Sequence, residues 1–139
     1  YQGITSSGQP FLITADQASA ANDGSGRIDM QQPRATITMK NGQIIKLQSK
    51  YGVFDQQDDV VDLAKDVVVT HTAKHLKLVS DALYADLKLG EIRSLVPVTV
   101  TDDARRINAE TMTVFEDGDR ILFGGNARMV MQVTDTAAN

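Results

Sequence analysis

Hydrophobic and polar residues alternate along much of this chain with a period of two, and the 3.6-residue period of a helix is not evident. The alternation is clear where threonines separate Ala35, Ile37 and Met39, and again where a threonine separates Val98 and Val100. A period of two places alternate side chains on opposite faces of a pleated strand. Strands of this kind, with turn signals about every 8–12 residues, predict an all-β sandwich, barrel or open roll.

A segment of about 30 residues repeats along the chain, which is typical of one supersecondary unit stacked on itself. Residues 46–55 (KLQSKYGVFD) are echoed by 77–86 (KLVSDALYAD) and 107–116 (INAETMTVFE), and a fainter copy lies at 12–18. Each copy later reaches a second short strand, at residues 33–35, 66–68, 97–99 and 126–128. One unit cannot bury its apolar face alone, so we expect stacked units that share one continuous core.

Turn signals and the polar termini set the predicted domain boundaries. Asn41-Gly42 and Asp117-Gly118 are typical of two-residue hairpin turns. The best helix candidate, residues 80–89, aligns with repeat copies that have a strand pattern, so we predict a strand there. The polar or small residues at both ends predict a flexible lead-in at 1–10 and a disordered tail at 134–139. Between them we expect a single domain, residues 11–133.

Composition excludes several classes of function. The 139 residues include 14 Lys+Arg against 18 Asp+Glu, and the absence of a basic run argues against nucleic-acid binding. Without cysteine, the chain has no disulfide, thiolate metal site or cysteine nucleophile. The sequence lacks an apolar stretch long enough to span a bilayer as a helix. Tyr1 in place of an initial Met indicates an excised piece or a processed product, which allows for a removed N-terminal segment.

The sequence offers weak candidates for catalysis or metal binding. His71 and His75 are the only histidines, and two residues four apart on a strand lie about 13 Å apart, too far to share one metal. The acidic clusters fall at predicted turns, where such residues are common for conformational reasons: residues 58–59, 102–103 and 116–119. We therefore predict a protein that is not an enzyme, with no catalytic residue, no metal and no cofactor.

Two small basic pairs have two open interpretations. Residues 105–106 and the pair Lys74 and Lys77 could contact a phosphate, or they could be solvated charges that guard a sheet edge against unwanted pairing.

The apolar positions of the alternating strands are the main candidate for function. They fit either an ordinary dry core or a groove for apolar guests. The alternation alone is more typical of an ordinary core, whereas low aromatic content, with no Trp, and soft methionine side chains point toward a groove. The predicted lipid path consists of Ile37, Met39, Ile45, Leu47, Val67, Val69, Leu76, Leu78, Val98, Val100, Ile107, Met112, Val114, Ile121, Phe123, Met129 and Met131.

The order of several short motifs resembles that of the LptC family and, more broadly, the LptA/OstA family. The resemblance spans roughly residues 1–133. Its matching segments are Gly3, Gly8-Gln9-Pro10-Phe11, residues 13–18, Pro33-Arg34-Ala35, Asn41-Gly42, residues 50–55, Leu63 with Asp66-Val67, residues 83–87, Pro97-Val98, residues 107–110 and residues 121–128.

The resemblance implies a twisted, incompletely closed β-jellyroll, also called a β-taco, and no enzymatic activity. It implies an adaptor that passes the acyl chains of lipopolysaccharide through its apolar groove, from the inner-membrane ABC transporter that exports this lipid to LptA. It also implies a periplasmic location, anchored to the inner membrane by an N-terminal helix absent from this chain. Two alternatives remain: an LptA-like soluble bridge, and a structural β-module that mediates assembly without binding lipid.

Edge strands are the predicted partner sites, because unpaired backbone groups of an open sheet accept a strand from another chain. The same pairing could join two copies of this chain into a homodimer. The candidate edge residues are Phe11, Ile13 and Ala15 in the first strand, and Ala127, Met129, Met131 and Val133 in the last.

Overall fold

The structure is a computed structural model that describes residues 2–4, 8–38, 42–115 and 120–131, with the backbone alone for 120 and 129–131. The strands are β1 (Gln2–Ile4), β2 (Pro10–Thr14), β3 (Gln17–Ala20), β4 (Arg27–Gln31), β5 (Arg34–Thr38), β6 (Ile44–Gln48), β7 (Tyr51–Asp55), β8 (Val60–His71), β9 (Leu76–Asp86), β10 (Glu91–Ser94), β11 (Val98–Thr101), β12 (Arg105–Ala109), β13 (Thr111–Phe115), β14 (Arg120–Gly124) and β15 (Arg128–Met131). One 3-10 turn, η1 (Thr72–Lys74), joins β8 to β9. The all-β prediction is confirmed.

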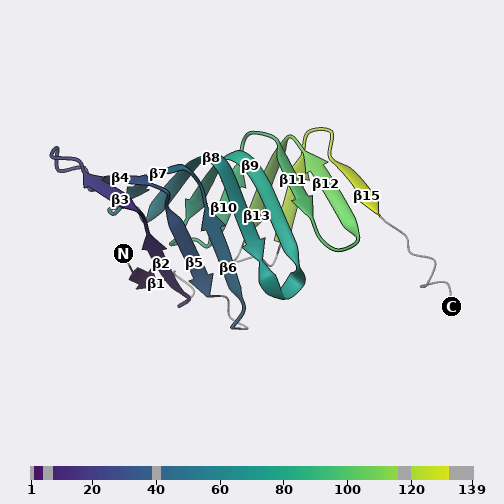
Figure 1. Cartoon of the computed structure of the whole chain (residues 1–139), viewed down its shortest axis with the longest axis horizontal. Helices are drawn as coiled ribbons and strands as arrows, with labels where there is room; N and C mark the ends of the chain where they lie inside the picture. Colours follow the sequence, from purple (N-terminus) through teal and green to yellow (C-terminus); the bar gives the residue numbers. More distant parts are fainter. Residues whose placement is uncertain (1, 5–7, 39–41, 116–119, 132–139) are drawn as a thin grey trace.

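The strands form one antiparallel sheet that folds back on itself into two facing layers (Figure 1). The long strands β8 and β9 belong to both layers. We define layer 1 as β1, β2, β5, β6, residues 67–71 of β8, residues 76–80 of β9, β11, β12 and β15. Layer 2 is β3, β4, β7, residues 60–64 of β8, residues 82–86 of β9, β10, β13 and β14.

The chain passes between the layers along one side of the molecule, which we call the crease. Backbone hydrogen bonds link successive corners there: the Gln32 amide donates to the Lys50 carbonyl at 2.8 Å, and the Lys50 amide donates to the Lys65 carbonyl at 2.9 Å. In β8 the corner is a bulge at Lys65 and Asp66, whose φ angles are 66° and 52°. Such a bulge bends a strand sharply. Together, these corners make an open, creased β-jellyroll, the fold that the family resemblance implied.

The echoed ten-residue segment of each repeat corresponds to one passage from layer 1 to layer 2, and the rest of the repeat returns to layer 1. Residues 46–55 run along β6, turn at the crease and continue as β7, and residues 77–86 make the same passage within β9 alone. The predicted strand at 80–89 is confirmed as far as Asp86. Leu47, Leu78 and Ile107 occupy equivalent places in successive units, because cross-strand pairing links them through Val69 and Val100.

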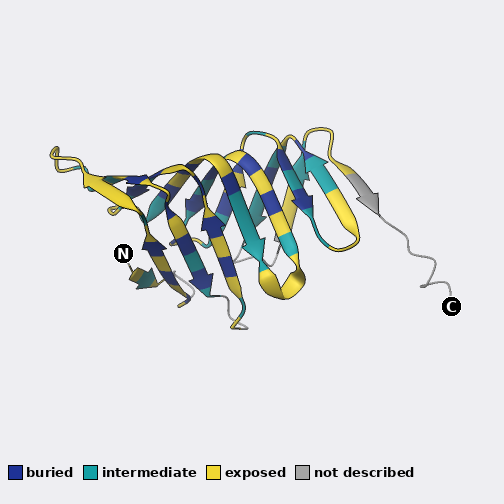
Figure 2. Cartoon of the chain, in the orientation of Figure 1, coloured by how far each residue is buried: buried dark blue, intermediate teal, exposed yellow. Residues whose placement is uncertain are grey.

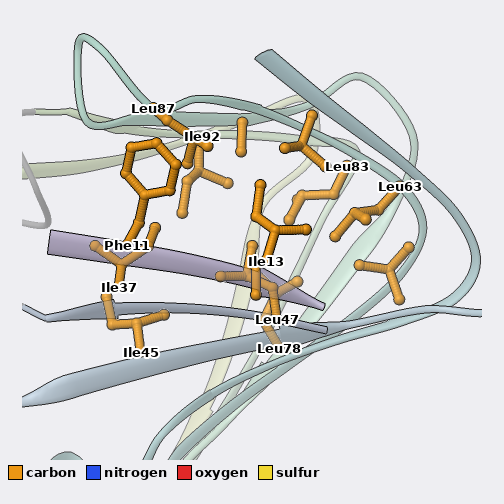
Figure 3. Close-up of a cluster of buried hydrophobic side chains, with 14 of the residues drawn as sticks. Phe11, Ile13, Ile37, Ile45, Leu47, Leu63, Leu78, Leu83, Leu87 and Ile92 are labelled. Carbon is orange, nitrogen blue, oxygen red and sulfur yellow. The ribbon is translucent and has the colours of Figure 1, made fainter. Parts of the chain in front are cut away.

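A single hydrophobic core fills the space between the layers. Figure 3 shows Phe11, Ile37 and Ile45 of layer 1 pointing toward Ile92 of layer 2 and toward Leu87, which follows β9. Alternation of buried and exposed residues along β2, β5 and β6 is visible in Figure 2, as expected for strands with one face on the core.

Gly52 illustrates how closely the layers approach the crease. A Cβ atom added at this buried glycine would lie 2.9 Å from Pro33 Cγ and 3.1 Å from Leu63 Cδ2. Because the proline ring is rigid, we expect Gly52→Ala to lower the free energy of unfolding by about 1–3 kcal/mol, as in overpacked cores. Urea denaturation measures this change. The exposed Gln31→Ala is the control and should stay within about 0.5 kcal/mol of the parent; equal stability of all three proteins would contradict the close approach.

The N-terminal end differs from the prediction. Gln2–Ile4, inside the predicted flexible lead-in, forms β1 and pairs with β2. Gly3 lies against the ring of Phe11, and any side chain there would overlap that ring. Because Gly3 has none, β1 can cover this edge of β2.

In the part of the chain that the structure describes, no helix is long and apolar enough to cross a bilayer.

Candidate functional site

The inner face, formed by the side chains that point between the two layers, is the candidate site. Near the crease it is tightly closed: Val67 is 0% exposed, and Val98 and Met112 are each 2% exposed. Toward the C-terminal end the same face opens. Ile107, Val114 and Phe123 are only partly buried against the core, and Ile121 is 46% exposed.

This opening follows from the pairing of the strands. Val114 pairs with Ile121 and Met112 pairs with Phe123, so these four side chains share the inner face of β13 and β14. Beyond β14 no further described strand covers that face. Figure 2 shows the corresponding change from buried to intermediate and exposed residues between the central strands and β12. We call the region around Ile107, Val114, Ile121 and Phe123 the C-terminal mouth.

The structure brings most of the predicted lipid path onto this one face. The buried members are Ile37, Ile45, Leu47, Val67, Leu78, Val98, Val100 and Met112. The partly buried members packed against the core are Val69, Leu76, Ile107, Val114 and Phe123. Met39 and the side chains of Met129 and Met131 lie outside the described residues.

The predicted path omitted most of the layer 2 half of the inner face. Phe54 is 1% exposed and Val61 is 2% exposed, and both belong to the same core as the predicted residues. The other buried residues of that half are Met30, Leu63, Leu83, Ala85, Leu87 and Ile92, and the partly buried Ile28 packs against the same core. The alternation of Val61 with Leu63, and of Leu83 with Ala85 and Leu87, was the sequence signal that could have identified them.

Buried polar groups occur at the crease, where they are satisfied by hydrogen bonds. Ser80 and Ser94 lie 3.2 Å apart, hydroxyl to hydroxyl, and the Ser80 hydroxyl also donates to the Pro97 carbonyl at 3.1 Å. The Ser94 hydroxyl donates to the Val96 carbonyl at 2.8 Å. Because buried hydroxyls need such partners, this network fixes the corners and is not available to a ligand.

The other candidate groups do not converge on a site. His71 ends β8 and His75 follows the 3-10 turn, and no cluster of His, Asp or Glu in the described residues could hold a metal ion. The Asp102 carboxylate accepts hydrogen bonds from the Ala104 and Arg105 amides, and these bonds lower its pKa. Asp102 therefore stabilises a turn, which is the role expected of an acidic residue between strands. The cluster at 116–119 lies outside the described residues.

The ends of the sheet differ in part from the predicted edges. Residues 128–131 form β15, which pairs only with β12 among the described strands, so this predicted edge is an edge. The predicted edge at Phe11, Ile13 and Ala15 is wrong, because β2 pairs with β1 on one side and β5 on the other. The strands β1, β3 and β14 are outermost in the described sheet. Ala127 precedes β15, and Val133 lies outside the described residues.

Comparison with known proteins agrees with this architecture. The crystal structure of LptH from Pseudomonas aeruginosa, the LptA homologous periplasmic component of the conserved lipopolysaccharide transport device, is similar to this chain with a TM-score of 0.69. The two sequences are 14% identical, and the similarity covers 90% of this chain and 96% of that chain. At this identity the likeness establishes the fold, an open β-jellyroll.

The family follows from the sequence. The sequence model of the family described as lipopolysaccharide-assembly, LptC-related, matches residues 1–132. The chain therefore belongs to the LptC-related family of lipopolysaccharide assembly, as the order of its motifs predicted. No curated protein matches the sequence.

Proposed function

We propose that this protein is a periplasmic adaptor of lipopolysaccharide transport that admits acyl chains to its inner face through the C-terminal mouth. Its membership of the LptC-related family supports a role in lipopolysaccharide transport. The observation that favours the mouth as the entry is the partial exposure of an otherwise buried apolar face, with Ile121 46% exposed beside the partly buried Phe123.

The energetics of acyl-chain transfer are consistent with a transient guest. Burying a methylene group is worth about 0.8 kcal/mol, so an acyl chain fully enclosed in protein would be released slowly. At the C-terminal mouth the apolar side chains are only partly buried, so a bound acyl chain would be only partly enclosed by protein and could leave. Movement from a membrane to such a surface exchanges one apolar setting for another, and the direction of transport must come from an energy-consuming partner.

The outermost strands are the proposed contacts with the partners on either side. At one end β14 and β15 are open to pairing, and at the other end β1 and β3 are. Strand addition at these edges would join the inner face of this domain to that of a neighbour without a gap. We propose the periplasmic part of the inner-membrane export transporter and LptA as the two neighbours. Anchoring to the inner membrane and edge-mediated pairing of two copies remain predictions.

Site-specific photocrosslinking in cells that make lipopolysaccharide tests the mouth. A photoreactive residue at Phe123 should form a lipopolysaccharide adduct, and one at Leu122 should not. The two positions are adjacent and apolar but point to opposite faces of β14, and Leu122 is the more accessible at 59% exposure. Val114 and Thr113 form a second matched pair on β13.

Each outcome of this experiment has a defined meaning. Adducts at Phe123 and Val114 alone support a lipid path on the inner face. Equal adducts at Leu122 and Phe123 would indicate general adhesion of lipid and would contradict the proposal. If no inner position reacts in a folded, abundant protein, the close packing around Val67 favours the second candidate, a structural module that assembles through its edges without binding lipid.

A further inference from the structure

The charged side chains of the two outer faces are segregated by sign. On the outer face of layer 1, cross-strand pairing aligns Lys46, Thr70, Lys77, Thr101 and Arg106 in one row across five neighbouring strands. Adjacent strands lie about 4.8 Å apart, so Lys46, Lys77 and Arg106 recur at intervals of about 10 Å. We call this row the basic row. Two of its members, Lys77 and Arg106, belong to the small basic pairs identified in the sequence analysis.

No acidic residue among the described residues shares this face. The next row toward the crease contains Arg34, Gln48, Val68, Val79, Thr99, Asn108 and Arg128. Asp102 and Asp103 follow Thr101 of the basic row in the β11–β12 turn. Asp102 is paired with Arg105 at 2.8 Å, and Asp103 with His75 at 3.4 Å.

The opposite outer face has the reverse charge. Among the residues whose side chains the structure describes, the charged residues in the corresponding rows of layer 2 are Arg27, Asp29, Asp55, Asp62, Asp86, Glu91 and Arg93. Acids therefore outnumber bases there, and the formal net charge of -4 conceals a basic face on layer 1. A field of one sign on one face selects partners of the opposite sign.

The basic row is accessible and unpaired. Lys46, Lys77 and Arg106 are exposed, and none of them has an ion-pair partner among the described residues. Figure 1 shows their strands β6, β9 and β12 in the layer nearest the viewer, with no segment in front of them. Surface cations often form ion pairs with neighbouring carboxylates. Because these three cations have no such carboxylate partner among the described residues, their full positive charge is available to an external partner.

Exposed aliphatic side chains accompany the cations on the same face. Leu12 is 39% exposed, Val79 is 42% exposed and Ile44 is 41% exposed. An open hollow of about 650 Å³ at the N-terminal end of this face is lined in part by Ile4, Leu12 and Thr36. Binding to a bilayer surface strengthens with the apolar area buried and with the electrostatic attraction to anionic lipids, and this face offers both kinds of group.

We propose that the outer face of layer 1 docks on the surface of a bilayer that contains anionic phospholipids, with the basic row on the lipid phosphates. A Lys or Arg close to an anionic membrane is worth about 1 kcal/mol, which corresponds to about fivefold in the partition coefficient. Three such cations correspond to about 100-fold. This contact lies outside the inner face, so it stands or fails independently of the proposed lipid path.

Vesicle co-sedimentation with the whole chain tests the proposal. Vesicles of equimolar phosphatidylglycerol and phosphatidylcholine should bind the protein, and vesicles of phosphatidylcholine alone should not. The triple variant Lys46→Gln, Lys77→Gln, Arg106→Gln should lose about 100-fold in partitioning. Binding should also weaken in rising salt, because the Debye length shortens.

A matched control variant shows whether vesicle binding depends on where the positive charges lie or only on how many of them are removed. The triple variant Arg27→Gln, Lys88→Gln, Arg93→Gln removes three positive charges from layer 2 and its turn, so both triples go from a net charge of -4 to -7. The layer 2 triple should bind anionic vesicles nearly as well as the parent. Equal losses in the two triples would overturn the proposal, provided that circular dichroism shows both to be folded.

Two other occupants of this face would be detected by the same assay. If inorganic phosphate at constant ionic strength displaces the protein from vesicles, the row is a discrete phosphate site, and docking on a bilayer is contradicted. If the parent chain self-associates without lipid, and the layer 1 triple abolishes this, the partner is the acidic layer 2 face of a second copy. Absence of both effects, with selective loss in the layer 1 triple, supports the bilayer.

Discussion

Val67→Arg is expected to unfold the protein or to lower its free energy of unfolding by at least about 3–5 kcal/mol, the cost of an unpaired buried charge. Val67 is completely buried, and the register places it opposite Ser80, with Val98 on the next strand. A guanidinium group there has no path to water and no carboxylate partner. Domains of this kind are stable by about 5–15 kcal/mol, so the loss removes much of the total. Urea denaturation followed by circular dichroism measures it.

The paired substitution Val114→Arg should leave the protein folded. Val114 is on the same inner face but at the C-terminal mouth, where it is only partly buried. An arginine there can extend its charged end into solvent while its stem covers the core. The variant should still prevent lipopolysaccharide adducts at Phe123, because the charge occupies the proposed entry. If both variants unfold, the mouth is closed. If both variants stay folded, the inner face near the crease is not tightly packed.

Phe54→Ala is expected to lower the free energy of unfolding by about 3–5 kcal/mol, as for other large-to-small changes at fully buried aromatic residues. Phe54 is 1% exposed and pairs across the strands with Ile28 and Val61, so it lies in the middle of the layer 2 half of the core. Removing the ring forfeits its burial and leaves a cavity between the layers. The shift in the urea midpoint at unchanged slope measures the loss.

Tyr51→Ala is the matched control, because it truncates an aromatic residue on the outer face of the same strand. Tyr51 is 50% exposed, and its ring contacts the Lys65 ammonium at 5.7 Å. A cation–π contact at an exposed site is worth about 0.5–1 kcal/mol, so the control should lose no more than that. Comparable losses at the two positions would contradict the assignment of Phe54 to the core and Tyr51 to the surface.

The predicted path covered most of the inner face of layer 1 but, in layer 2, only residues of β13 and β14, and β7 shows one physical reason for the difference. Along β11, Val98 and Val100 point inward and threonines point outward, so the contrast between faces is clear. Along β7, Gly52 and Phe54 point inward while Tyr51 and Val53 point outward. Apolar residues on both faces of β7 conceal which face is buried, and only the packing of the two layers decides it.

The opening of the inner face could not be predicted from alternation either. Val67 and Val69 are two residues apart on β8 and point to the same face, yet Val67 is completely buried and Val69 is only partly buried. The period of two assigns a side chain to a face but does not indicate how far the opposite layer extends over it. The pairing of β1 with β2 likewise depends on Gly3 fitting against the Phe11 ring, a tertiary contact with no periodic signal.

The stacked units give the protein an adjustable length. Each repeat adds two strands to each layer, and because adjacent strands are about 4.8 Å apart, one unit extends the molecule by about 10 Å. Leu47, Leu78 and Ile107 repeat the same inward position from one unit to the next. Duplication or loss of a whole repeat would therefore change the span of the domain in steps of about 10 Å while preserving its interior. Such a domain can act as a molecular ruler, set by the number of repeats in its gene.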